Sequence, residues 1–132
     1  MDGIKTVVSA FGPKDTMDRL EAAVRAKGMT VFARIDHAAG AAEVRLVLRP
    51  TEVLMFGNAK SGTPLMQARQ TIGLDLPLKA LVWQDASGKT WLSYNDPHWV
   101  VSRHGGDAAL DPVATEMAAA LAALSSAATQ RP

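Results

Sequence analysis

A hairpin pattern in the second half of the chain constrains the fold more than any other feature. Two apolar-rich runs, residues 78–85 and 89–95, flank the short segment Ala86-Ser87-Gly88. Glycine readily adopts the left-handed backbone conformation that a tight turn between antiparallel strands needs. The pattern therefore predicts a β-hairpin, and a fold built around antiparallel strands.

The remaining sequence predicts further strands separated by helices. Apolar and β-branched residues indicate strands over residues 4–10, 29–36 and 52–57, with the alternation that places successive side chains on opposite faces. The alanine-rich residues 37–43 are either a loop or a single helical turn. After them an extended pattern resumes over residues 44–48. We therefore expect several strands besides the hairpin.

Four helices are predicted from capping residues and apolar spacing. Their expected starts are Asp15, Thr63-Pro64, Asp96-Pro97 and Asp111-Pro112. The last helix carries an apolar stripe that should pack on the sheet, made of Val113, Met117, Leu121 and Leu124. Residues after Ser125 should fray. The chain is thus expected to form one α+β domain over residues 1–125, followed by a frayed tail over residues 126–132.

Composition excludes several classes of protein. The 132 residues include no cysteine, which removes disulfide scaffolds, thiol enzymes and cysteine-ligated metals. Lys and Arg number 14 against 13 Asp and Glu, so the chain lacks the basic excess with which proteins neutralise nucleic-acid phosphates. No apolar run approaches the roughly 18 residues of a membrane span, and the start shows no signal-peptide pattern. We therefore expect a cytoplasmic protein with no nucleic-acid or membrane partner.

Three stretches in order resemble one family. They are Arg34-Ile35-Asp36-His37, then Phe56-Gly57-Asn58-Ala59-Lys60-Ser61-Gly62-Thr63-Pro64-Leu65-Met66, and finally Leu76-Pro77-Leu78-Lys79 with Ser93-Tyr94-Asn95-Asp96-Pro97. Together they are similar to the bacterial and archaeal domain-of-unknown-function family three hundred and two, over residues 7–105. The resemblance implies an antiparallel sheet backed by helices, a β-α-β(4)-α topology of the TATA-binding-protein-like type, and a homodimer. It implies no activity. Ala59 departs from the family where proline is common, which predicts a less rigid loop.

The residues themselves also favour a homodimer. Segments 53–56 and 78–83 are apolar on both faces of their predicted strands. The helices supply a cover for one face with certainty, so the other face needs a partner.

Residues 57–63 form the most suggestive candidate site. They have the G-x-x-x-x-G spacing of a phosphate loop, follow a strand and precede a helix. Thr63 stands where a phosphate loop has lysine, which argues against nucleotide hydrolysis. Two interpretations remain: a tight turn in which Thr63 caps the helix, or an anion site contacted by Asn58, Lys60, Gly62 and Thr63.

Four other polar residues are candidates for ligand contact. His37 could act as a general base, or Asp36 could cap the following turn while His37 packs or hydrogen-bonds at an interface. Lys79 lies in an apolar strand, where it is either functional or extends to water. Asn95 belongs to the family-like motif at a strand end.

Metal and cofactor chemistry finds no support in the spacing. His98 and His104 are six positions apart, about 600° around a helix, so they do not share a face. We expect no metal and no cofactor. Trp83 and Trp91 fall near a cross-strand pair, which is either a stacking platform or part of the core or dimer packing.

Three functions are consistent with these features. The leading hypothesis is a small homodimeric domain that binds a modest anionic or amphipathic ligand near residues 57–63. An enzyme is the alternative, with His37 as acid or base and Asp36 or Asn95 orienting it. A purely structural protein would have no pocket at all.

Overall fold

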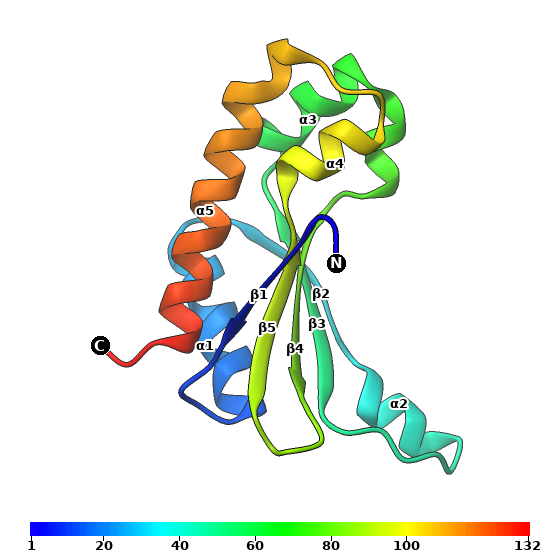
Figure 1. The fold of residues 1–132 in the computed structure, drawn as a ribbon, viewed down its shortest axis with the longest axis vertical. Coiled ribbons are helices and arrows are strands. Elements are labelled where there is room, and N and C mark those ends of the chain that lie inside the picture. Colours follow the sequence, from blue (N-terminus) through cyan, green and yellow to red (C-terminus); the bar gives the residue numbers. More distant parts are fainter.

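The hairpin lies within a five-stranded antiparallel sheet. In the computed structural model, which describes residues 1–132, β4 (Leu78–Gln84) pairs with β5 (Thr90–Asn95), and Gly88 takes a φ of +86° in the turn. The strand order is β1-β5-β4-β3-β2, with β1 (Ile4–Val8), β2 (Thr30–Asp36) and β3 (Thr51–Gly57) (Figure 1). Every neighbouring pair is antiparallel. The expected α+β fold is confirmed.

The main core lies between one face of the sheet and two helices. These are α1 (Pro13–Ala26) and α5 (Asp111–Thr129), which lie side by side on that face (Figure 1). The fully buried side chains of this core include Met17, Leu20, Leu54, Phe56, Val82, Leu92, Leu121 and Leu124. Leu121 and Leu124 of the predicted stripe therefore pack on the sheet as expected, whereas Val113 and Met117 pack in a second core.

A second, smaller core lies beyond one end of the sheet. It is formed by α3 (Ala59–Ala68), the 3₁₀ turn η1 (Gln70–Leu74), α4 (Pro97–Arg103), the 3₁₀ turn η2 (Ala108–Leu110) and the first half of α5 (Figure 1). Its buried side chains are Leu65, Ile72, Val100, Val101, Leu110, Ala114 and Met117. Because α5 contributes to both cores, it joins this group of short helices to the sheet.

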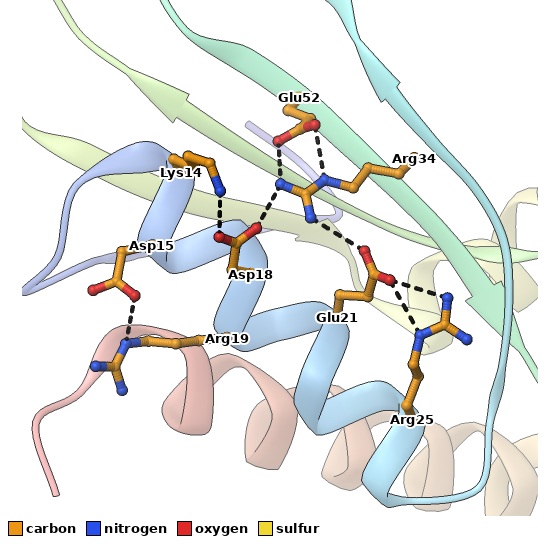
Figure 2. Close-up of polar contacts among 8 residues, drawn as sticks. All are labelled: Lys14, Asp15, Asp18, Arg19, Glu21, Arg25, Arg34 and Glu52. Carbon is orange, nitrogen blue, oxygen red and sulfur yellow. Dashed lines mark hydrogen bonds and ion pairs between the residues drawn. The ribbon is translucent and has the colours of Figure 1, made fainter.

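Arg34 of β2 ties this edge strand to α1 and β3. Figure 2 shows its guanidinium among three carboxylates: it donates to Glu52 at 2.8 Å and pairs with Asp18 and Glu21 of α1 at 2.9 and 3.1 Å. The hydrogen bond from Lys14, together with Arg34, holds the pKa of Asp18 below its ordinary value. Since each of these charges is paired within the chain, the cluster fastens the sheet edge and leaves no charge free for a ligand.

The structure corrects two predicted helix boundaries. α3 begins at Ala59, with Asn58 as its N-cap, so Thr63 is not a cap and Pro64 lies inside the helix. α5 continues to Thr129, whose carbonyl accepts a hydrogen bond from the N–H of Ala10 at 2.8 Å. Residues 126–129 therefore belong to the folded helix, because this contact and the buried Ala128 hold its last turn.

Two further local predictions differ from the structure. α1 begins at Pro13 with Gly12 as N-cap, two residues before the expected Asp15. Residues 37–43 form a helix, α2 (His37–Glu43), and residues 44–48 form no strand because no strand of this chain lies alongside them. Asp36 caps α2 as the second interpretation proposed, accepting from the N–H of Ala39 at 2.9 Å.

The last helix also corrects the expectation about apolar runs. By length and composition alone, the helical stretch Ala108–Thr129 is apolar enough to cross a bilayer. Its many alanines raise its hydropathy without forming a run of large apolar side chains. One side of α5 is buried in both cores, and a core helix of this kind passes the same test, so the stretch is weak evidence for a membrane span.

Candidate functional site

The predicted site residues lie at opposite ends of the sheet. In the β2–β3 register Thr30 pairs with Gly57, next to Asn58, whereas Asp36 pairs with Glu52. Six residues of strand separate these ends, a distance of roughly 20 Å at about 3.3 Å per residue. Asp36 and His37 therefore do not share a site with residues 57–63.

A cavity of about 430 Å³ lies beside the start of α3. It is bounded by the end of the sheet, by α3, by the segment after η1 and by α5. Its apolar lining includes Met29, Phe32, Met66, Leu76, Pro77, Leu78, Val113, Met117 and Ala120. Cavities of about 300–1,000 Å³ with a mainly apolar wall and a few polar groups are typical of small-molecule sites in proteins.

Polar groups gather on the α3 side of this cavity. Asn58, Ser61 and Thr63 contribute to the lining, and the predicted site residue Gly62 does so as well. A side chain at Gly62 would come within 3.5 Å of Leu76, which is ordinary contact. The cavity thus has an apolar body and one wall with hydrogen-bonding groups.

The N-terminus of α3 is already occupied by the chain's own acceptors. The N–H of Lys60 donates to Oδ1 of Asn58 at 2.8 Å, and the N–H groups of Ser61 and Gly62 donate to the Asn58 carbonyl. Three of the first four helical N–H groups are therefore satisfied. This arrangement weakens the attraction for an anion, which depends on unpaired donors.

Charge in the cavity is negative rather than positive. Glu116 of α5 lines it, and it is the one charged side chain that does so. Lys60 is exposed on α3, forms no ion pair and is not part of the lining. The predicted lysine contact is therefore absent from the cavity wall.

Lys79 and Asn95 are brought together at a separate, much smaller cavity. It measures about 20 Å³, room for about one water molecule. Lys79 is half-buried, and its ammonium donates to the carbonyls of Asp75 and Pro77 at 3.2 and 3.1 Å. Burial lowers the pKa of Lys79, and the charge of Asp75 opposes this. Lys79 therefore fastens the turn before β4 rather than reaching the large cavity.

His104 belongs to a partly buried polar tether between η1 and α4. It is hydrogen-bonded to both Asp75 and Thr71, and Arg103 also pairs with Asp75. Burial raises the pKa of Asp75, but the hydrogen bond from His104 and the charge of Arg103 outweigh it, so the pKa is lowered. His98 points elsewhere, toward Thr115 of α5. The two histidines are thus held by different partners.

No group converges on His37 to make it a catalytic base. Its side chain is exposed at the first residue of α2, and the carboxylate of Asp36 is engaged by the N–H of Ala39. Asn95 pairs with Ile4 at the end of the sheet that holds Lys79, opposite to His37. The enzyme hypothesis requires these groups in one cleft.

Sequence reasoning missed most of the cavity wall. Met29 directly precedes β2 and Phe32 lies in it, while Glu116 and Ala120 come from α5. One signal was available: Glu116 and Ala120 are four residues apart, so both lie on one helix face, next to the face of the apolar stripe. The stripe alone did not reveal that this neighbouring face borders a cavity.

Comparison with known proteins gives one family and two kinds of relative. A family model described as "Domain of unknown function DUF302" matches residues 5–127. An uncharacterized conserved DUF302 protein from Bacillus stearothermophilus has a crystal structure with a TM-score of 0.86, covering 97% of this chain and 99% of that one at 24% sequence identity. This likeness shows the fold alone.

The curated relatives are longer proteins. Fluoride-specific ion channel FluC 1 of Brucella suis biovar 1 is 52% identical over 102 residues, which are 77% of this chain and 40% of that protein. Fluoride-specific ion channel FluC 2 of Brucella melitensis biotype 1 has the same identity over 38% of its length. The chain thus matches about two fifths of these relatives.

Proposed function

Because the chain belongs to the DUF302 family, whose description names no activity, we propose a function from its cavity: it binds a small amphipathic ligand beside α3. The observation that carries this proposal is the 430 Å³ cavity with an apolar body and one polar wall. Three methionines, Met29, Met66 and Met117, contribute to the apolar lining. Their flexible, polarisable side chains adapt to ligands of different shape.

The charge of the ligand follows from the cavity wall. Glu116 is its one charged lining residue, and Lys60 lies outside it. A carboxylate in a partly apolar site disfavours an anionic head group and attracts a cationic one. Of the two ligand types expected from the sequence, the amphipathic one is therefore favoured over the anionic one, with a neutral or cationic head group.

Three probes with the same alkyl chain test this proposal. Octylamine, octanol and octanoate differ only in head group, and their binding is measured by calorimetry below micelle-forming concentrations. We expect octylamine to bind most tightly and octanoate most weakly. Glu116→Gln should remove the difference between octylamine and octanol. Tightest binding of octanoate would instead support the anionic ligand.

A cavity-filling substitution supplies the structural control. Ala120 lines the cavity, so Ala120→Phe should fill part of it and weaken octylamine binding at least tenfold. Ala123 is exposed on the same helix and lines none of the cavities described above, so Ala123→Phe should bind as the wild type does. Equal affinity of Ala120→Phe and wild type would overturn the proposed site.

We further propose that the chain is a homodimer joined through the open face of the sheet. The open face is the sheet surface opposite α1 and α5. Side chains at its edges are exposed, among them Ile4, Val8 and Ile35. Between them lie the stacked rings of Trp83 and Trp91, with centroids 6.1 Å apart, as the sequence predicted for a cross-strand pair. Thr6 and Ser93 also lie on this face, and the exposed apolar side chains around them support association.

The curated relatives support a second candidate function. Since proteins named fluoride-specific ion channels contain a stretch 52% identical to this chain, we propose that the chain acts as an accessory domain beside such a channel. Binding of a ligand in the cavity beside α3 would then be the signal that this domain passes to the channel. The test replaces the matching segment of the Brucella suis relative with this chain and measures fluoride flux in vesicles. Ala120→Phe should change the flux, and unchanged flux would contradict the role.

A further inference from the structure

Residues 37–50 leave the sheet between β2 and β3 as an arm with no core of its own. α2, which begins the arm, has no buried residue. The segment after it exposes four large apolar side chains: Val44 by 66%, Leu46 by 65%, Val47 fully and Leu48 by 46%. Figure 1 shows the arm projecting beyond the end of the sheet, away from α1 and α5. A single exposed leucine is ordinary, but four such side chains within five residues are not.

The backbone N–H groups near the end of the arm are also unpaired. Residues 46–49 have the apolar composition of a strand, yet they belong to no helix or strand. The N–H groups of Val47, Leu48 and Arg49 donate to no acceptor in the chain, whereas the N–H of Leu46 donates to the Ala41 carbonyl. Arg45 has a φ of +61°, a backbone conformation that residues other than glycine rarely adopt. Residues 47–49 therefore hold an extended shape without donating a backbone hydrogen bond to the chain.

The arm continues the open face of the sheet. Ile35, on the open face, is two residues before the arm, and Thr51, which follows the arm, pairs with Trp83 on the same face. The arm thus leaves and re-enters the sheet beside residues of the open face. One partner could cover both surfaces.

The open face alone is small for a stable dimer. Five strands of about six residues, spaced about 4.8 Å apart with about 3.3 Å per residue, cover a flat area of roughly 480 Å², before the relief of the side chains is counted. A standard interface buries about 800 Å² on each partner. Each fully buried aliphatic side chain adds on the order of 100 Å². The four side chains of the arm would therefore bring the interface close to the standard size.

We propose that the arm is exchanged between two copies of this chain: Val44, Leu46, Val47 and Leu48 of each copy pack against the second copy, beside the paired open faces. This inference rests on the proposed homodimer, and it assigns the additional buried area to one segment. The free N–H groups of residues 47–49 then lie where the second copy can supply acceptors. Arm exchange also explains why a short segment keeps so many apolar side chains that its own chain does not bury.

The first test compares two charged substitutions by sedimentation equilibrium. Val47→Asp places a charge on the arm, and Leu74→Asp places one on a leucine that is 74% exposed in η1, in the group of helices at the other end of the sheet. Both residues are exposed in the single chain, so both variants should unfold at the same temperature as the wild type when dilute. Val47→Asp should raise the dimer dissociation constant at least tenfold, and Leu74→Asp should leave it unchanged.

The second test uses the absence of cysteine from the chain. A single thiol introduced by Leu46→Cys should react more slowly with a thiol reagent as protein concentration rises. The midpoint of this decrease in rate should equal the midpoint of dimer formation. Leu74→Cys should react at the same rate at all concentrations. Concentration-independent reaction of Leu46→Cys would overturn arm exchange.

The outcomes separate the arm from the dimer itself. If the wild type is a dimer and Val47→Asp is an equally stable dimer, arm exchange is overturned and the proposed homodimer stands. A wild-type monomer at micromolar concentration would overturn both. If that monomer sediments with vesicles of anionic phospholipid and Val47→Asp does not, the arm would instead belong to a membrane surface, and exchange would be refuted.

Discussion

The backbone N–H of Lys60 donates to Oδ1 of Asn58 at 2.8 Å, and this contact begins α3 four residues before the Thr63-Pro64 pair. It has a direct consequence for anion binding. Three of the four N–H groups at the start of α3 are used by the chain, and the Lys60 side chain is exposed to solvent beside them.

Sulfate should therefore stabilise the wild type and Lys60→Ala equally. Sulfate stabilises proteins in general because it is excluded from their surface, and a specific site would add a contribution that depends on Lys60. The measurement is the unfolding free energy of both proteins in sulfate, with chloride at matched ionic strength as the control. A larger gain for the wild type would reinstate the anion site.

Leu121→Ala should destabilise the fold by about 2–5 kcal/mol, the usual cost of removing a buried leucine side chain. Leu121 is only 2% exposed and lies in the main core between α5 and the sheet. Urea unfolding measures the change. Leu74→Ala, at an exposed leucine, should cost less than about 0.5 kcal/mol and serves as the control. Similar costs for the two variants would show that α5 does not pack on the sheet.

Stability should fall in acid partly because of Asp85. The hydrogen bond from the Trp91 indole N–H, at 2.9 Å, and those from Ser87 lower the pKa of Asp85 from its ordinary 3.8 to about 2. A carboxyl whose pKa is lower in the folded state contributes stability above its unfolded pKa, and this contribution is lost as pH falls through the folded value.

The test compares wild type and Asp85→Asn by urea unfolding between about pH 5 and about pH 2. Asparagine does not titrate, so the variant should be less stable near neutral pH and should lose less stability over this range. The same loss in both proteins would contradict the hydrogen-bonded carboxylate.

Local patterns predicted those elements whose signals lie within a few residues. Gly88 indicated the hairpin turn, and in the structure it takes a positive φ there. Asp36 and Asp96 indicated helix caps, and each accepts a hydrogen bond from an N–H group at the start of its helix. The start of α3 was mispredicted because Asn58 and Thr63-Pro64 are both good starting signals. Pro64 is tolerated inside the helix as its sixth residue. Tertiary packing decided between two locally similar alternatives.

The cavity could not be predicted because its walls come from distant parts of the chain. Gly57 and Asn58 were candidates from their loop spacing, but Glu116 and Ala120 reach the same space only once α5 has packed beside the sheet. The extended segment expected at 44–48 does not form a strand because it has no neighbouring strand within the chain. A strand needs a neighbour, and the sequence of one chain does not show whether that neighbour lies in another copy.

Methionine methyl NMR tests the proposed site most directly. The chain has six methionines, of which Met29, Met66 and Met117 line the cavity, while Met1, Met17 and Met55 do not. Titration of methyl-labelled protein with octylamine should shift the first three signals along one saturable binding curve and leave the other three in place. Shifts confined to Met1, Met17 or Met55, or no shift at saturating probe, would contradict a ligand site beside α3.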